Sequence, residues 1–355
     1  MTTAVRGAES AKPARDQPSP GLAQTNARRT LGWLVLLAVL VGVMFLSVLI
    51  GSEDLPFSTV WDGLVHFDAL VVEHNFVRAR VSRTVLGVLV GLALGVAGAL
   101  IQAMTRNPLA DPGILGVNAG AAFFVALAVG VFGLTTIWTN IWFAFLGAIV
   151  ATALVYLVGS RGVAGSTPVR LTLAGVAIGA LLGGVTVGLV LLDPVAFDQM
   201  RAWNAGSIAG RPLDVPTAVL PFILLGVLLS AFVARPLNAV ALGDDLARSL
   251  GADVLRTRVI GIVAVTLLCG AATAAAGPIG FIGLMIPHVC RWIVGPDQRW
   301  ILLYTLVSAP LLLLASDILG RVILADSEVP VGVVTAFLGA PVLIALVRRS
   351  KASGL

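Results

Sequence analysis

The sequence predicts an all-α integral membrane protein with about ten transmembrane helices. Only 12% of its 355 residues are charged and 58% are hydrophobic, whereas about a quarter of the residues in a soluble domain are charged. The apolar residues form continuous runs of the length that crosses a bilayer as a helix, about 20 residues. Strands of a membrane β-barrel are shorter and alternate in polarity, so these runs argue against that class.

The N-terminal segment and the rest of the chain differ in composition. Residues 1–30 combine Pro, Gly, Ala, Ser and scattered charges without periodicity, which predicts a disordered cytoplasmic tail. Residues 31–350 are predicted to form one transmembrane domain. Its first run, residues 31–50, is too long for a signal-peptide core, so we expect an uncleaved span. Nine further spans are expected at residues 84–104, 114–133, 138–158, 169–192, 215–234, 259–276, 279–294, 300–319 and 329–347.

The distribution of basic residues predicts the topology. With ten spans and the N-terminus in the cytoplasm, 17 of the 23 Lys and Arg residues lie on the cytoplasmic side and six lie outside, as the positive-inside rule requires. The eighth segment, residues 279–294, is the weakest candidate because it is short and contains Pro287 and His288. It must nevertheless cross if both termini are to be cytoplasmic.

Two runs of glycine at every fourth position predict helices that approach one another closely in the membrane. They are Gly87, Gly91 and Gly95, and Gly175, Gly179 and Gly183.

Several kinds of chemistry lack the residues that would carry them. All 18 acidic residues fall in the tail, in loops or at span ends, including Asp317 near the outer end of the ninth span, whereas a proton-driven carrier needs a carboxylate in mid-membrane. His288 is expected to be a hydrogen-bonded structural residue rather than a proton relay. Cys269 and Cys290 are expected to be small buried side chains. We expect no catalytic site, no metal site and no nucleic-acid partner.

The sequence contains no Gly-Lys pair and therefore no Walker A loop. If ATP drives this protein, another chain must bind it.

The stretch ALGDDLARSLGADV, residues 241–254, interrupts the apolar chain between the sixth and seventh spans. We expect a short amphipathic helix on the cytoplasmic side, capped by an aspartate, ended by a glycine and carrying its apolar groups on one face. Two large apolar side chains hold a helix only weakly to lipid, so a groove in a partner protein is the better site for it. The residues assigned to this contact are Gly243, Asp244, Asp245, Leu246, Ala247, Leu250 and Gly251.

This stretch resembles the coupling-helix segment of the iron-chelate and vitamin B12 permease family of bacterial ABC importers. Four other segments are similar to signatures of the same family, in the same order. They are GALIQAMTRNPLADPGILGVNAGA (98–121), WNAGSIAGR (203–211), GPIGFIGLMIPHVCR (277–291), and ASDILGR (315–321) with the C-terminal EVPVGVVTAFLGAPVLIALVRR (328–349).

The resemblance implies a type II ABC importer permease in the bacterial cytoplasmic membrane. It implies a second permease subunit, identical or different, and a cytoplasmic dimer of ABC ATPases that binds ATP and Mg²⁺. It also implies a substrate-binding protein outside, and no cofactor on this chain itself.

The resemblance also implies roles for particular residues. In the family, an Arg-x-Pro-Arg segment before the second span contacts acidic groups of the binding protein, as does an arginine after the ninth span. Arg80, Arg83 and Arg321 match these positions as rim charges, and Ser82 replaces the proline, which implies a less rigid loop. The remaining signature residues are expected to shape a rigid cytoplasmic turn (Asn107, Pro108, Asp111 and Pro112) and a broken eighth helix (Gly277, Pro278, Gly283, Pro287 and His288).

The resemblance implies an Fe(III)–siderophore as the cargo, because such chelates are the most frequent cargo of the family. The wording of the 107–120 segment looks closest to ferric-enterobactin-type permeases. Cobalamin and haem systems share the scaffold and stay open as alternatives. Two other classes compete: a secondary carrier that works alone, and a membrane scaffold without transport. The carrier would need a coupling carboxylate or a polar pore stripe, which the sequence lacks, and the scaffold would not need the docking helix.

Overall fold

The computed structural model describes the whole chain except residues 1–21, 24, 52, 161–167, 325–326 and 353–355. All regular secondary structure in the described part is helical. The helices are α1 (Asn26–Leu49), α2 (Phe57–Val65), α3 (Val72–Thr105), the 3₁₀ helix η1 (Pro112–Leu115), α4 (Val117–Gly130), α5 (Ile137–Ser160), α6 (Pro168–Leu192), α7 (Pro194–Asn204), α8 (Asp214–Ala241), α9 (Asp244–Ser249), α10 (Val254–Ala276), α11 (Ile282–Val294), α12 (Gln298–Val322) and α13 (Val331–Ala352).

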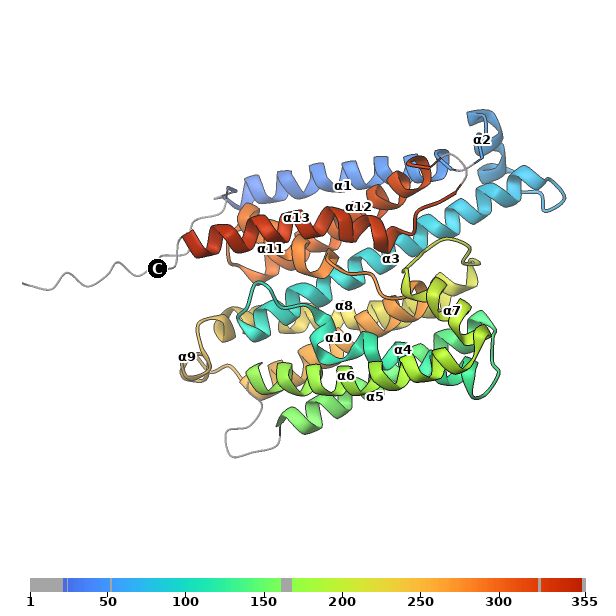
Figure 1. Cartoon of the computed structure of the whole chain (residues 1–355). Coiled ribbons are helices and arrows are strands. Elements are labelled where there is room, and N and C mark those ends of the chain that lie inside the picture. The colour runs from blue at the N-terminus through green and yellow to red at the C-terminus, as the bar shows by residue number, and fades with distance from the viewer. Residues whose placement is uncertain (1–21, 24, 52, 161–167, 325–326, 353–355) are drawn as a thin grey trace, which may run out of the picture.

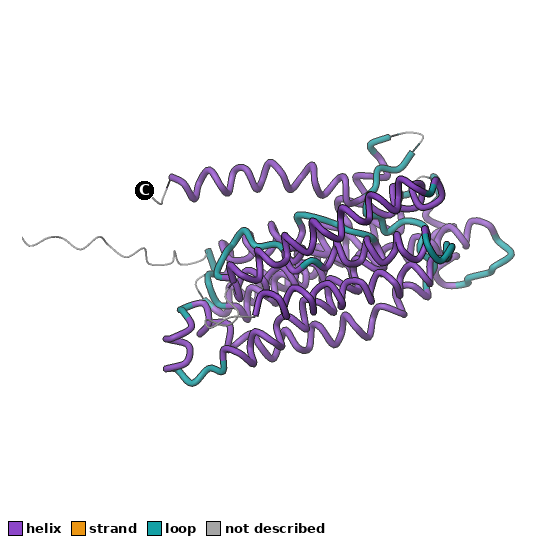
Figure 2. Tube along the Cα trace, turned by 60° about the horizontal axis from the view of Figure 1, so that its bottom comes forward, coloured by secondary structure: helices purple, strands orange, loops and turns teal. Residues whose placement is uncertain are grey.

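Each of the ten expected spans contains a helix. Among the described residues, seven helices are long and apolar enough to cross a membrane, and α4, α11 and α13 provide shorter apolar segments. The helices run side by side in an elongated bundle, with α1 along one edge and α5 and α6 along the opposite edge in Figure 1. Most connecting loops lie toward the two ends of this bundle (Figure 2).

The two ends of the bundle differ in what they carry. The start of α1, the coupling-helix candidate α9 and the end of α13 lie at one end, whereas α2 and α7 lie at the other (Figure 1). We refer to these as the α9 end and the α2 end. Both ends of the described chain share the α9 end, as an even number of crossings requires.

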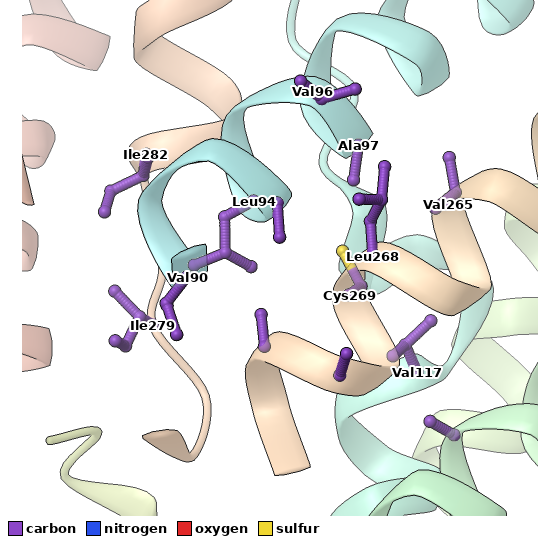
Figure 3. Close-up of a cluster of buried hydrophobic side chains, with 14 of the residues drawn as sticks. Val90, Leu94, Val96, Ala97, Val117, Val265, Leu268, Cys269, Ile279 and Ile282 are labelled. Carbon is purple, nitrogen blue, oxygen red and sulfur yellow. The ribbon is translucent and has the colours of Figure 1, made fainter. Parts of the chain in front are cut away.

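Helix α3 forms the centre of the bundle, and 83% of its apolar window is buried. The first glycine run lies where α3 packs on α12: a Cβ at Gly91 would come within 2.6 Å of the Pro310 backbone. The hydrophobic core continues from α3 to α10 and to the segment before α11, as Val90, Leu94, Leu268, Ile279 and Ile282 show (Figure 3). The prediction of close packing is therefore confirmed for this run.

The second glycine run behaves differently, because only its first member packs tightly. A Cβ at Gly175 would come within 1.7 Å of the Ile114 carbonyl, but a Cβ at Gly183 would meet nothing within 4 Å. The expectation of close contacts along the whole run is therefore wrong within this chain.

Two expected boundaries are wrong. Helix α1 begins at Asn26, inside the expected tail, because Thr25 caps it by accepting a hydrogen bond from the Arg28 amide at 3.3 Å. The amides of Leu22 and Ala23 donate to the carbonyls of Trp292 and Ile293. The expectation of a disordered tail otherwise falls on residues outside the described part.

Helix α3 begins at Val72, twelve residues before the expected span at 84 (84 − 72 = 12), and projects past the bundle at the α2 end (Figure 1). Its polar first part made the helix resemble a loop in the sequence. The short helices α2 and α7 were also not predicted.

The eighth segment crosses the bundle as expected, in two parts. The carbonyl of Ala276, at the end of α10, accepts a hydrogen bond from the Ser207 amide at 2.8 Å. The chain then runs without helical structure from Gly277, which has a φ of 75°, to Phe281, the residue that precedes α11. Helix α11 ends beside Leu22, near the start of α1. The predicted break is confirmed at Gly277 and Pro278, whereas Pro287 lies inside the continuous helix α11 and does not interrupt it.

Candidate functional site

The three arginines expected at the outer rim lie at the α2 end, but they are not rim residues. Arg80 and Arg321 are 7% and 4% exposed, and the Arg83 side chain is 12% exposed. All three point into the junction of α1, α3 and α12. The expectation of exposed rim charges is therefore wrong, because each guanidinium has partners inside the chain.

Asp317 on α12 lies at the centre of this junction and is 1% exposed. The Arg83 Nη2 atom donates to its carboxylate at 2.8 Å, and Arg321 Nε donates to it at 3.0 Å. Arg83 Nη1 also donates to Glu328 at 2.6 Å. Charge-assisted, multidentate pairs of this kind are the strong hydrogen bonds of proteins. They fasten α3, α12 and the loop before α13 together.

The end of α1 joins the same network through Ser47, which is fully buried. Its carbonyl accepts a hydrogen bond from Arg321 Nη1 at 2.7 Å, and its hydroxyl lies 2.8 Å from the Thr84 hydroxyl. Arg80 makes only carbonyl contacts, to Val48, Leu49 and Glu53. Among the described residues it forms no ion pair.

A recess of about 120 Å³ opens between these side chains and is lined by Arg80, Arg83, Arg321, Glu53 and Glu328, among others. Within the described chain, ion pairs join Arg83 and Arg321 to the carboxylates of Asp317 and Glu328, whereas Arg80 has no ion pair. A partly buried cation without a carboxylate partner favours the approach of one more anion. The recess can therefore accept a carboxylate from outside the chain.

The sequence suggested a flexible loop around Ser82, but the structure has no loop there. This segment lies within α3, and the Ser82 hydroxyl donates to the Arg211 carbonyl at 2.7 Å. A proline has no hydroxyl for this bond, so serine fastens α3 to the loop before α8.

At the opposite end, α9 forms a short helix between α8 and α10, as predicted. The expected aspartate cap is wrong, because Gly243 is the N-cap and no side chain caps the helix; Asp244 and Asp245 lie in its first turn. Gly243 has a φ of 117°, a conformation that only glycine adopts readily, and Gly251 has a φ of 81°. The Leu246 and Leu250 side chains are 48% and 62% exposed. They leave two adjacent apolar groups uncovered at this end of the bundle.

Ala247 does not share the exposed face with the two leucines, which corrects the expectation for this residue. It is fully buried against Val240 of α8 and Val254 of α10. Asp244 is also turned toward the bundle: its carboxylate lies 2.9 Å from Arg258 Nη2 and 3.8 Å from Arg106 Nη2. Asp245, in contrast, points into solvent.

The expected turn after α3 is built from side-chain caps. The Asn107 side chain accepts a hydrogen bond from the Leu109 amide at 3.0 Å, across Pro108. The Asp111 side chain accepts one from the Gly113 amide at 2.7 Å, and Pro112 then begins η1. The four residues do shape a tight connection, as expected.

Gln102 connects two signature segments, and sequence reasoning missed it. Pro287 has no N–H, so the Gly283 carbonyl in α11 lacks its helical donor. Gln102 Nε2, which is buried in α3, donates to the carbonyls of Gly283 at 3.3 Å and Leu284 at 2.9 Å. Gly98 leaves room for this approach, because a Cβ there would come within 1.8 Å of the Gly283 carbonyl oxygen. The presence of Gln102 within the first signature was the only available signal.

His288 packs its ring edge-on against Trp292, with the ring centroids 4.7 Å apart. In the described chain its Nδ1 atom has no hydrogen-bond partner, so the expectation of a hydrogen-bonded histidine is wrong for this nitrogen. Across the described residues, no three His, Cys, Asp or Glu side chains gather as a metal-ligand set.

These features can be compared with known proteins. Residues 37–349 match the model of the FecCD transport family. The chain is 48% identical to the ferric enterobactin transport system permease protein FepD of Escherichia coli, over 95% of this chain and 99% of that one. It is 37% identical to the probable siderophore transport system permease protein YfiZ of Bacillus subtilis, over 89% and 96% of the two chains.

A solved inward-facing structure of a metal-chelate type ABC transporter superposes with a TM-score of 0.80 at 25% identity, over 90% of this chain and 99% of that chain. The fold, the order of the signature segments and the length of the match agree. The chain belongs to the FecCD transport family of ABC importer permeases.

Proposed function

We propose that this chain is the membrane subunit that carries an Fe(III)–siderophore into the cell in an ATP-driven importer. The observation that carries the proposal is the 48% identity, over nearly the full length of both chains, to a permease for ferric enterobactin. So complete a match favours a related cargo over an unrelated one. Both termini and α9 lie in the cytoplasm in this proposal, and the α2 end faces outward.

At the α2 end, the recess around Arg80 receives an acidic side chain of the substrate-binding protein. Arg83 and Arg321 already have carboxylate partners in Asp317, so Arg80 is the guanidinium that most needs a new one. A single inserted carboxylate then fixes the register of the docked protein, because a desolvated charge pair needs close geometry. Arg83 and Arg321 support the recess from within.

At the α9 end, the exposed Leu246 and Leu250 enter a groove in the cytoplasmic ATPase. Two apolar side chains four residues apart form the stripe that a helix presents to a groove. This chain itself hydrolyses no ATP in the proposal. Closure of the ATPase pair pushes on α9, and the packed bundle rocks between outward and inward access.

A second permease subunit covers the α6 face. Only 11% of the apolar window of α6 is buried, and a Cβ at Gly183, Gly184 or Gly188 would meet nothing within 4 Å. Small residues with open space let another helix approach closely. The helix that ends at the C mark in Figure 2, α13, also lies along the edge of the bundle. With α6, it lines the central path in this proposal.

The test is reconstitution of the permease with its ATPase, its partner permease and its binding protein in lipid vesicles. Uptake of labelled iron as a ferric tricatecholate is measured beside haem and cobalamin, together with ATP hydrolysis. We expect uptake of the ferric chelate alone, in step with hydrolysis. Uptake of haem or cobalamin instead would refute the proposed cargo, and uptake without the ATPase would refute the proposal of an ATP-driven importer.

A paired variant tests the coupling contact in the same vesicles. Replacing Leu246 and Leu250 with Asp places two charges in an apolar groove and should abolish substrate-dependent ATP hydrolysis. Docking of the binding protein at the far end should be unchanged. Normal hydrolysis by this variant would show that α9 is not the contact.

A further inference from the structure

The attachment of α9 to the bundle is sparse, which makes each of its contacts identifiable. The helix has six residues and is bounded by Gly243 and Gly251, both with positive φ. Its only buried apolar side chain is Ala247, a single methyl group against Val240 and Val254. The Ala252 amide donates to the Ala247 carbonyl at 2.9 Å. Such a helix would pivot on its glycines if nothing else held it.

The remaining attachment is the Asp244 carboxylate, which faces two arginines from different helices. Arg258 Nη2, on α10, lies 2.9 Å from it, and the Arg258 side chain is only 11% exposed. Arg106, which ends α3, lies 3.8 Å away and is 42% exposed. Arg106 has a φ of 54°, and its guanidinium would lie 3.6 Å from a Cβ placed on Gly243. The left-handed end of α3 therefore brings this cation over the first turn of α9.

We infer that Asp244 is a positioning residue that locks α9 to α3 and α10, so that the stroke of the ATPase reaches the bundle instead of turning α9 about its glycines. This inference rests on the proposed function, because it needs an ATPase that pushes on α9. The coupling segment then has two faces with different partners. Leu246 and Leu250 face the partner, whereas Asp244, through Arg258 and Arg106, faces the bundle.

The first experiment needs no transport. A nitroxide label on Ser249→Cys reports the mobility of α9 in the purified permease, and the two native cysteines are buried. Asp244→Asn should increase the label mobility at least twofold. Asp245→Asn is the matched control, because this neighbouring carboxylate is solvent-exposed and pairs only with Arg248 of the same helix; it should leave the label unchanged. Equal mobility in the two variants would overturn the inference.

The second experiment measures the ratio of cargo imported to ATP hydrolysed by the complete importer. Asp244→Asn should lower this ratio at least fivefold while the ATPase still copurifies with the permease. Arg258→Gln should lower it similarly and Arg106→Gln less. Arg256→Gln is the control, because Arg256 is exposed on α10, the helix that carries Arg258; it should leave the ratio of cargo to ATP unchanged. Because the three residues act as one lock, the double variant Asp244→Asn with Arg258→Gln should be no worse than either alone.

The outcomes separate this inference from the proposed function. Loss of the ATPase from the Asp244→Asn complex would mean that Asp244 contacts the ATPase, and effects that multiply in the double variant would mean that the residues act independently. Either result overturns the lock. If the unsubstituted complex imported nothing, the proposed function would fail, and the label mobility would still decide whether Asp244 fixes α9.

Discussion

Gln102→Leu removes the amide that joins α3 to α11 and keeps the size of the side chain. Gln102 is 2% exposed, and its Nε2 atom is the donor available to the Gly283 carbonyl once Pro287 has removed the helical one. A buried acceptor without a partner destabilises a protein by about 1–3 kcal/mol. We therefore expect Gln102→Leu to lower the free energy of unfolding by roughly that amount.

The measurement is thermal unfolding of the purified permease in detergent. One kcal/mol shifts the midpoint by roughly 2–4 °C in a domain of about 200 residues and by less in a longer chain, so a drop of a few degrees is expected. Gln199→Leu is the matched control. Gln199 makes a single contact, with Asn140 at 3.3 Å, in a half-buried position, and its replacement should have the smaller effect.

A second substitution tests the reason for the effect. Pro287→Ala restores an N–H that can donate to the Gly283 carbonyl within the helix. In that background Gln102→Leu should destabilise the protein by about 1 kcal/mol less than it does alone. Equal losses in both backgrounds, or a Gln102→Leu protein as stable as the Gln199→Leu control, would refute the reasoning.

The outer recess and the turn before α12 each give a further prediction. Arg80→Gln should weaken binding of the substrate-binding protein at least about tenfold, because a desolvated charge pair is lost. Arg78→Gln, at an exposed site, should change the affinity little. Titration calorimetry with the two purified proteins measures both affinities, and equal values for the two variants would contradict the role of the recess. Asp297 caps α12. Partial burial alone would raise its pKa, but hydrogen bonds from Arg299 and Asn238 hold the pKa below its usual range. The folded-state pKa is the lower one, so Asp297 should stabilise the protein above about pH 4 and lose this effect as the pH falls further. The stability gap to Asp297→Asn should therefore close in acid, and a gap independent of pH would argue against it.

The number of spans could be predicted because it depends on a local property. A run of about 20 apolar residues needs no partner to be recognised, and the backbone chemistry of Gly277 and Pro278 breaks the eighth segment wherever that segment packs. The glycines that bound α9 act in the same local way. These features were therefore visible in the sequence.

The features of the candidate site that were missed depend on contacts between distant segments. Arg80 and Arg83 looked like rim charges of a loop before the second span, since nothing nearby in sequence reveals that Asp317 lies against Arg83 across 234 residues. Ala247 was placed with the leucines by helical spacing, but its burial depends on where α8 and α10 end.

Helix α3 makes polar contacts near the α2 end, in the middle of the bundle and at the α9 end. Arg80 and Arg83 meet the outer recess, Gln102 bonds to carbonyls of α11, and Arg106 faces the Asp244 carboxylate. Arg80 and Arg106 are 26 residues apart (106 − 80 = 26), which is about 39 Å along a helix. An 18-residue apolar window of α3 is 83% buried, and packed interiors do not stretch. A displacement at either end must therefore move the whole helix with its partners, which favours rocking of the bundle over a gate that opens at one end alone.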